Sequence, residues 1–175
     1  MARNWRISLF SGLLIAAYFI PTWSVVAYRI MISPVQGLFE RPNVAVAFFL
    51  SDHLQLASLA TVRVAWLLAL SKFTVVAFLA IFLLFAVRNL IRKTEGYREP
   101  LAIALTLGCL ISFASLILAS KVGEVEALRL HATEFFMMLG TAMIMLIERP
   151  SEPLVRSIAA TSDLSVEQAQ LSNNG

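Results

Sequence analysis

Four long apolar stretches separated by short polar segments dominate the pattern along the chain. They cover residues 7–28, 64–87, 101–120 and 127–147. Because an α-helix rises about 1.5 Å per residue, roughly 20 apolar residues cross the hydrocarbon core of a bilayer. Each stretch therefore predicts one membrane-spanning helix. We expect an all-α integral membrane protein in which residues 1–148 form a single four-transmembrane-helix bundle.

Residues 44–63 carry a different pattern. Asp52, His53 and Gln55 lie at the centre of this segment, where a lipid-facing span would place them at the most costly depth. The polar positions recur three apart and apolar side chains fill the other face, which is typical of a helix lying at an interface. The three residues are thus predicted to form an interfacial polar segment. We expect an interfacial or re-entrant helix, or an extension of the second span, and not a fifth crossing.

Basic residues set the expected topology. With four spans, the basic connection at residues 88–98 lies on the same side of the membrane as Arg3 and Arg6. An excess of Lys and Arg marks the cytoplasmic side. The pattern therefore predicts a multi-pass protein of a bacterial-type inner membrane with both termini in the cytoplasm. Residues 149–175 are predicted to be a polar cytoplasmic tail.

Composition supports a chain surrounded by lipid. Of the 175 residues, 59% are hydrophobic and 14% are charged, whereas a soluble domain has roughly a quarter charged residues. The net charge of +3 would suit a nucleic-acid partner, but the basic side chains sit at the ends of apolar stretches, as membrane anchors do. We therefore expect contact with membrane lipids and no nucleic acid. The single cysteine, Cys109, excludes an internal disulfide and a thiolate metal cluster built from this chain alone.

Two opposite charges stand inside predicted spans. Lys72 lies in the second span and Glu134 in the fourth, at similar depth from the same side. A buried charge costs at least a few kcal/mol unless it is compensated, so we expect the two to form an intramembrane ion pair. His131 precedes Glu134 by three residues and shares its helical face, which extends the pair to a polar cluster. Such a cluster either fixes helix register or carries protons or ions.

Small residues recur four apart in two spans, at Ser8, Gly12 and Ala16 and at Ala104, Gly108 and Ser112. This spacing lets helix backbones approach. We therefore expect the first and third spans to cross closely, with Gly12, Gly108 and Ser112 in the contact. The second span presents a bulky aromatic surface, predicted to face lipid, a partner subunit, or a bound quinone or pigment. Its members are Phe73, Phe78, Phe82 and Phe85.

Catalytic signatures are absent from the sequence, which has no phosphate-binding glycine loop, nucleophile elbow or zinc-protease motif. We expect no enzyme activity, no metal and no cofactor. The first hypothesis is a small non-catalytic integral-membrane subunit or scaffold that associates with itself or with a larger membrane protein complex. The alternative is a component of an ion- or proton-coupled transporter or channel that uses Lys72, Glu134 and His131. A third hypothesis, a quinone- or haem-binding redox subunit, would draw on His53 and His131.

Overall fold

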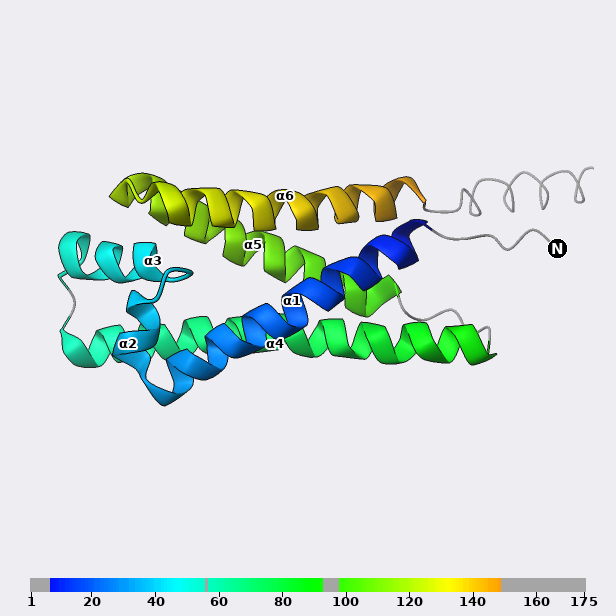
Figure 1. The fold of residues 1–175 in the computed structure, drawn as a ribbon, viewed down its shortest axis with the longest axis horizontal. Helices are drawn as coiled ribbons and strands as arrows, with labels where there is room; N and C mark the ends of the chain where they lie inside the picture. Colours follow the sequence, from blue (N-terminus) through cyan, green and yellow to red (C-terminus); the bar gives the residue numbers. More distant parts are fainter. Residues whose placement is uncertain (1–6, 56, 93–97, 149–175) are drawn as a thin grey trace, which may run out of the picture. The chain divides into compact units, whose positions relative to one another are not determined.

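The computed structural model describes residues 7–55, 57–92 and 98–148 (Figure 1). The chain divides into two compact units, Met1–Met145 and Leu146–Gly175. Within the second unit the described residues are 146–148, of which the first two complete the last helix. The predicted polar tail at residues 149–175 lies outside the described part of the chain.

Every regular element of the described residues is helical. The elements, in chain order, are α1 (Ile7–Ile32), α2 (Pro34–Phe39), α3 (Val44–Phe48), the π-helical turn η1 (Phe49–His53), α4 (Ser58–Arg92), α5 (Arg98–Val122) and α6 (Val125–Ile147). Four of them are long and apolar enough to cross a membrane: Ile7–Ile32, Ser58–Asn89, Arg98–Val122 and Val125–Ile147. The prediction of an all-helical protein with four membrane-spanning helices is confirmed, and the short apolar helix Val44–His53 stands between the first two.

The predicted helix at residues 44–63 is divided in two. Residues 44–53 form the short helix, and residues 58–63 are the first turns of α4. Gln55 lies between the two parts with a backbone φ of 44°, a left-handed conformation that an ordinary helix does not contain. The segment is therefore both a separate short helix and an extension of the second span.

Local sequence explains where α2 begins and where α5 ends. Pro34 occupies the start of α2, a position that suits its fixed φ and its missing N–H. Gly123 has φ 79° and its N–H donates to the Ala119 carbonyl at 3.0 Å, which closes the last turn of α5 as a C-terminal glycine cap does. The chain then turns directly into α6. This tight reversal places the start of α6 beside the end of α5.

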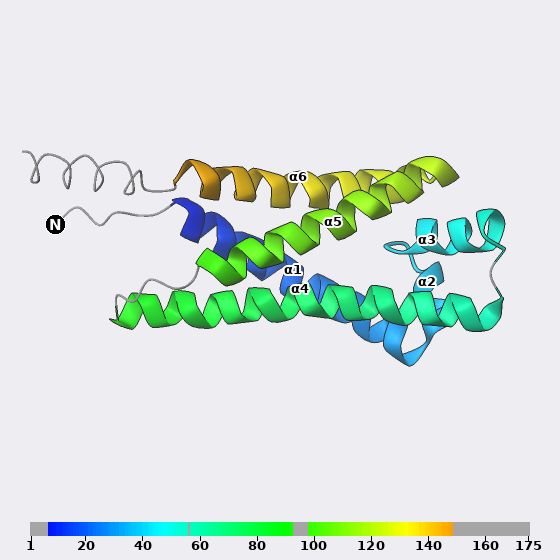
Figure 2. The ribbon, with the colours of Figure 1, turned by 180° about the vertical axis from the view of Figure 1, so that it is seen from behind.

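The long helices are arranged so that α2, α3 and the turn between α5 and α6 lie at one end (Figures 1 and 2). We call this the α3 end. At the α3 end, α1 finishes, α4 begins, and α5 passes into α6. At the opposite end, α1 begins and α4 is followed by α5. Helix α1 packs most extensively on α4, and α5 also packs on α4.

The core has two main apolar clusters. The larger one joins α1, α4 and α5, with Met138 as the contribution of α6. The second lies toward the α3 end and packs α2 and α3 against α1 and α4 through side chains that include Leu38, Leu50 and Ala65. Apolar packing in lipid gains van der Waals contact but little hydrophobic free energy, because lipid tails are as apolar as leucine. These clusters therefore fit the helices together without fixing their register strongly.

The predicted small-residue contacts lie inside the core. A Cβ added to Gly12 would lie 2.8 Å from Phe82 Cζ and 2.9 Å from Leu101 Cδ2, and one added to Gly108 would overlap the Met138 side chain. Ser112 is fully buried. Gly12 thus meets α4 as well as α5, and the main neighbour of the first span is α4, not the predicted third span.

Phe82 does not belong to an outward-facing aromatic surface, so this part of the prediction for the second span is wrong. This ring is 0% exposed and belongs to the main core cluster, while Phe73 and Phe78 are partly buried and Phe85 is exposed. The reason is that Phe82 lies where α1 crosses α4, beside Gly12 of α1 and within the same core cluster as Leu101 of α5. The four rings do not form one surface open to a ligand.

Substituting Gly12 tests the crossing of α1 with α4. Gly12→Ala should lower the free energy of unfolding by ~1–3 kcal/mol, because the added methyl overpacks against Phe82 and Leu101. The measurement is thermal unfolding in mild detergent. Gly140→Ala is the matched control, since nothing lies within 4 Å of a Cβ at that site. Equal melting temperatures for the two variants would contradict the observed crossing.

Candidate functional site: a buried polar cluster

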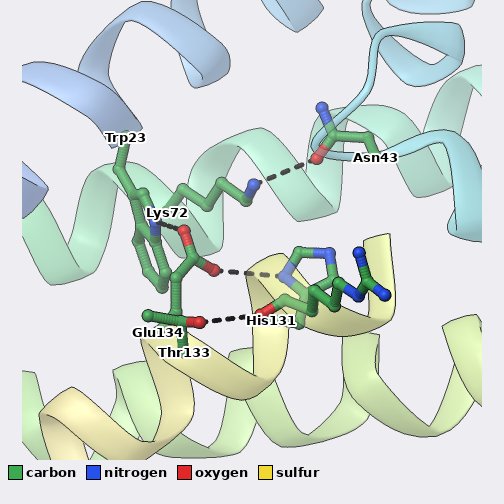
Figure 3. A network of polar contacts seen from close by, with 7 residues as sticks. Trp23, Asn43, Lys72, His131, Thr133 and Glu134 are labelled. Carbon is green, nitrogen blue, oxygen red and sulfur yellow. Dashed lines mark hydrogen bonds and ion pairs between the residues drawn. The ribbon is translucent and has the colours of Figure 1, made fainter. Parts of the chain in front are cut away.

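Five polar side chains from four helical elements converge in the core (Figure 3). The polar cluster comprises Trp23 from α1, Asn43 at the start of α3, Lys72 from α4, and His131 and Glu134 from α6. All five residues are buried, with between 1% and 6% of their surface exposed. Ionisable side chains are seldom so buried unless their charges are compensated. The contacts of each member therefore decide what the cluster can do.

Glu134 is held by two donors on different helices. Its Oε1 accepts a hydrogen bond from Trp23 Nε1 at 3.0 Å, and its Oε2 lies 3.1 Å from His131 Nδ1. Hydrogen bonds to a carboxylate are stronger than those between neutral groups. The predicted association of His131 with Glu134 is present. The indole contact joins α6 to α1, which is 111 residues away in the sequence.

Lys72 is compensated by a different pair of groups. Its Nζ donates to Asn43 Oδ1 at 3.0 Å and lies 5.4 Å from the centroid of the Trp23 ring. An ammonium at this distance from an indole face is attracted by the negative face of the ring. The lysine therefore has one neutral acceptor and one aromatic partner.

Asn43 connects the lysine to the α2 segment. Its side-chain Nδ2 donates to the Gly37 carbonyl at 3.0 Å, while its Oδ1 accepts from Lys72. The residue directly precedes α3, but its side chain makes no capping hydrogen bond to that helix. Asn43 thus uses both ends of its amide to tie α2 to α4.

The direct ion pair predicted between Lys72 and Glu134 takes an indirect form. Among the described residues, no hydrogen bond or ion pair of 4.0 Å or less joins the two charges. Trp23 interacts with both, because its ring face meets the ammonium and its N–H donates to the carboxylate (Figure 3). The two residues therefore share one cluster, as their similar depth suggested, with the indole as intermediary.

The other predicted polar residues lie elsewhere. Asp52, His53 and Gln55 are exposed in η1 and the break that follows it. The His53 ring stacks on Phe49 with centroids 5.0 Å apart, and Asp52 accepts a hydrogen bond from Ser51. None of the three belongs to the polar cluster. Their place at the membrane interface stays a prediction.

Sequence reasoning did not place Trp23 or Asn43 in the site. For Trp23 a signal was available, since an indole N–H buried among apolar helices requires an acceptor. For Asn43 the only hint was its position before a short helix, which predicts a cap instead. Its actual role depends on how α3 folds back on α4.

An apolar groove is lined by none of the five residues of the polar cluster. It has a volume of about 300 Å³, is open on one side and runs between α3, α4 and α5. Its lining is almost wholly apolar, with Ser71 and Ser115 as the polar exceptions. Among the described residues, no three His, Cys, Asp or Glu side chains are placed to hold a metal ion.

Comparisons with known proteins identify no relative of this chain. No protein-family model matches the chain, and no curated protein or solved structure is significantly similar to it. The geometry of the cluster therefore carries the functional argument.

Removing the indole donor tests the Trp23 to Glu134 contact. Trp23→Phe should lower the free energy of unfolding by ~2–4 kcal/mol, because the ring shrinks and the buried carboxylate loses a donor. In a Glu134→Gln background the same substitution should cost less, and thermal unfolding of the four proteins measures the difference. Trp66→Phe is the control, since Trp66 is 40% exposed. Purely additive losses would contradict the contact.

Proposed function

We propose that this chain is a small non-catalytic integral-membrane subunit or scaffold that associates with itself or with a larger membrane protein complex. One observation carries the proposal. The two buried charges, Lys72 and Glu134, are compensated by side chains of the same chain at one level of the bundle. Such an arrangement suits a cluster that holds helices in register.

The polar cluster has the connections that register control requires. Its members join α1, α3, α4 and α6. The contacts of Trp23 with Glu134, of Lys72 with Asn43 and of Lys72 with Trp23 are lost if one of these elements slides or turns relative to the others. In an apolar medium, an uncompensated buried charge or donor costs much more than a lost apolar contact. The cluster therefore favours one arrangement of helices whose remaining surfaces are largely interchangeable.

The outer surface of the spans supports association. In the most apolar 18-residue window of each span, only 22–33% of the residues are buried within the chain, and the share is lowest in α6. Large apolar side chains point outward from α6, with Phe136 66% exposed and Met143 52% exposed. These surfaces meet lipid, and they also offer a neighbouring helix an extended apolar contact.

Ion or proton coupling through Lys72, Glu134 and His131 has weaker support. Toward the end opposite α3, the core contains apolar side chains such as Phe82 and Leu101. The Ser11 and Thr141 hydroxyls there hydrogen bond to each other. A path across the membrane needs polar or water-lined groups throughout. The polar cluster accounts for one part of such a path.

A redox subunit with a haem between two histidines has the least support. His53 is exposed at the α3 end, whereas His131 is buried with one nitrogen committed to Glu134. A haem held by both would need the two rings on opposite faces of one buried site. The described side chains do not bring them together.

The proposed membrane topology rests on the number of spans and on the basic residues. Four spans place both ends of the chain on one side, and the basic residues Arg88 and Arg98 flank the connection at the end opposite α3. By the positive-inside rule this end faces the cytoplasm. We assign the α3 end to the outer side of a bacterial-type inner membrane.

The mass of the protein in native lipid tests the proposal. Extraction into lipid nanodiscs, followed by native mass spectrometry, should give a protein mass above the 19.3 kDa of one chain. Phe136→Ala, on the outward face of α6, should reduce the assembled fraction severalfold because it removes exposed contact area. Leu84→Ala is the control, as Leu84 is exposed on α4. A wild-type protein that is monomeric, with no other protein attached, would contradict the proposal.

A further inference from the structure

Two buried polar atoms near the polar cluster have no hydrogen-bond partner among the described residues. They are Nε2 of His131, in a residue 2% exposed, and Oγ of Ser112, in a residue 0% exposed. The large majority of buried side-chain polar atoms have a partner in protein or ordered water. Two orphans so close to a charged cluster point to a bound molecule.

The hydrogen bonding of Glu134 decides what His131 offers. A carboxylate only accepts hydrogen bonds, so the 3.1 Å contact with His131 requires a proton on Nδ1. In the neutral ring, Nε2 then carries a lone pair and accepts. The orphan nitrogen therefore needs a donor.

Ser112 lies at the same level of the bundle. The position of Gly108 faces Met138 of α6 and Val75 of α4, and Ser112 follows it by one helical turn on the same face. Helices α4 and α6 run antiparallel to α5. One turn further in the same direction, α6 carries Glu134 and α4 carries Lys72. The buried hydroxyl is thus directed toward the helices that carry the two charges.

Lys72 supplies the donors that complete the site. An ammonium has three N–H groups, and the described contacts use one of them, toward Asn43. Figure 3 shows the ammonium and the His131 ring on the same side of the Trp23 indole, with Asn43 above them. The ligand must therefore accept from Lys72 and donate to His131.

Charge selects a neutral ligand. Lys72 and Glu134 already balance, so an added ion would leave a net charge inside the spans, which is costly. Water accepts, donates and is neutral, and buried water usually has two to four polar partners. We infer that one water molecule bridges Lys72 Nζ and His131 Nε2, with Ser112 Oγ as its third partner.

This water joins the two halves of the polar cluster. The hydrogen-bonded chain then runs from Asn43 through Lys72, the water and His131 to Glu134 and Trp23. A proton can leave Nζ for the water while the water gives one of its own to Nε2. That shift converts ammonium and imidazole to amine and imidazolium, and it leaves the total charge unchanged.

Histidine-labelled protein tests the water directly. The full-length chain carries two histidines, so ¹⁵N-histidine labelling with His53→Gln leaves His131 as the single labelled ring. In lipid nanodiscs, water-edited NMR should show transfer from water to the His131 ring, with Nδ1 protonated and Nε2 unprotonated. No transfer in the folded protein, or a proton on Nε2 instead of Nδ1, would overturn the inference.

Variants locate the water. Ser112→Ala should reduce the transfer severalfold, because the water loses a partner. Ser71→Ala is the matched control, since the Ser71 hydroxyl donates to its own helix at the Leu68 carbonyl, and it should leave the transfer unchanged. Equal transfer in both variants would place the water elsewhere and overturn the site. A monomeric mass in the nanodisc experiment would reject the proposed subunit role without affecting this result.

Discussion

The Trp23 indole lies between two opposite charges, and through them it joins three of the four long helices. Its face meets the Lys72 ammonium and its N–H donates to the Glu134 carboxylate. Neither charge is stable alone inside an apolar bundle. Placed on one aromatic side chain, they compensate each other without touching. Helices α1, α4 and α6 are thereby joined at one level.

The α2 and α3 segment is attached through the same cluster. Asn43 accepts from Lys72 and donates to the Gly37 carbonyl, while apolar residues such as Leu38 and Leu50 pack on α1 and α4. The polar contacts fix position, and the apolar contacts supply area. A segment that follows a span can in this way fold back over the bundle and cover its charged interior.

Hydropathy and length were sufficient to predict the spans, because an apolar stretch of bilayer thickness has few alternatives to a crossing helix. Counting residues along two helices was also sufficient to place Lys72 and Glu134 at similar depth. What counting cannot supply is the rotation of each helix about its axis. The rotation of each helix determines that Trp23 and Phe82 face inward. It also determines that Lys72 and Glu134 both contact the Trp23 ring and not each other.

The contribution of Asn43 could not be predicted for a related reason. Its contact with Lys72 spans 29 residues and requires the helix to break between His53 and Ser58, where Gln55 has a left-handed backbone. Local sequence indicates a cap at this position, and tertiary packing overrides it. By contrast, the His131 and Glu134 contact is local, three residues apart on one helix, and the sequence was enough to predict it.

The most direct measurement is a thermodynamic cycle on the two charges. Thermal unfolding of the wild type, Lys72→Met, Glu134→Gln and the double variant gives their interaction free energy. If the charges compensate each other across Trp23, each single change leaves an unbalanced buried charge, and the double variant loses ~1–3 kcal/mol less than the sum of the single losses. Additive losses would show that the two charges do not interact, and would contradict the account.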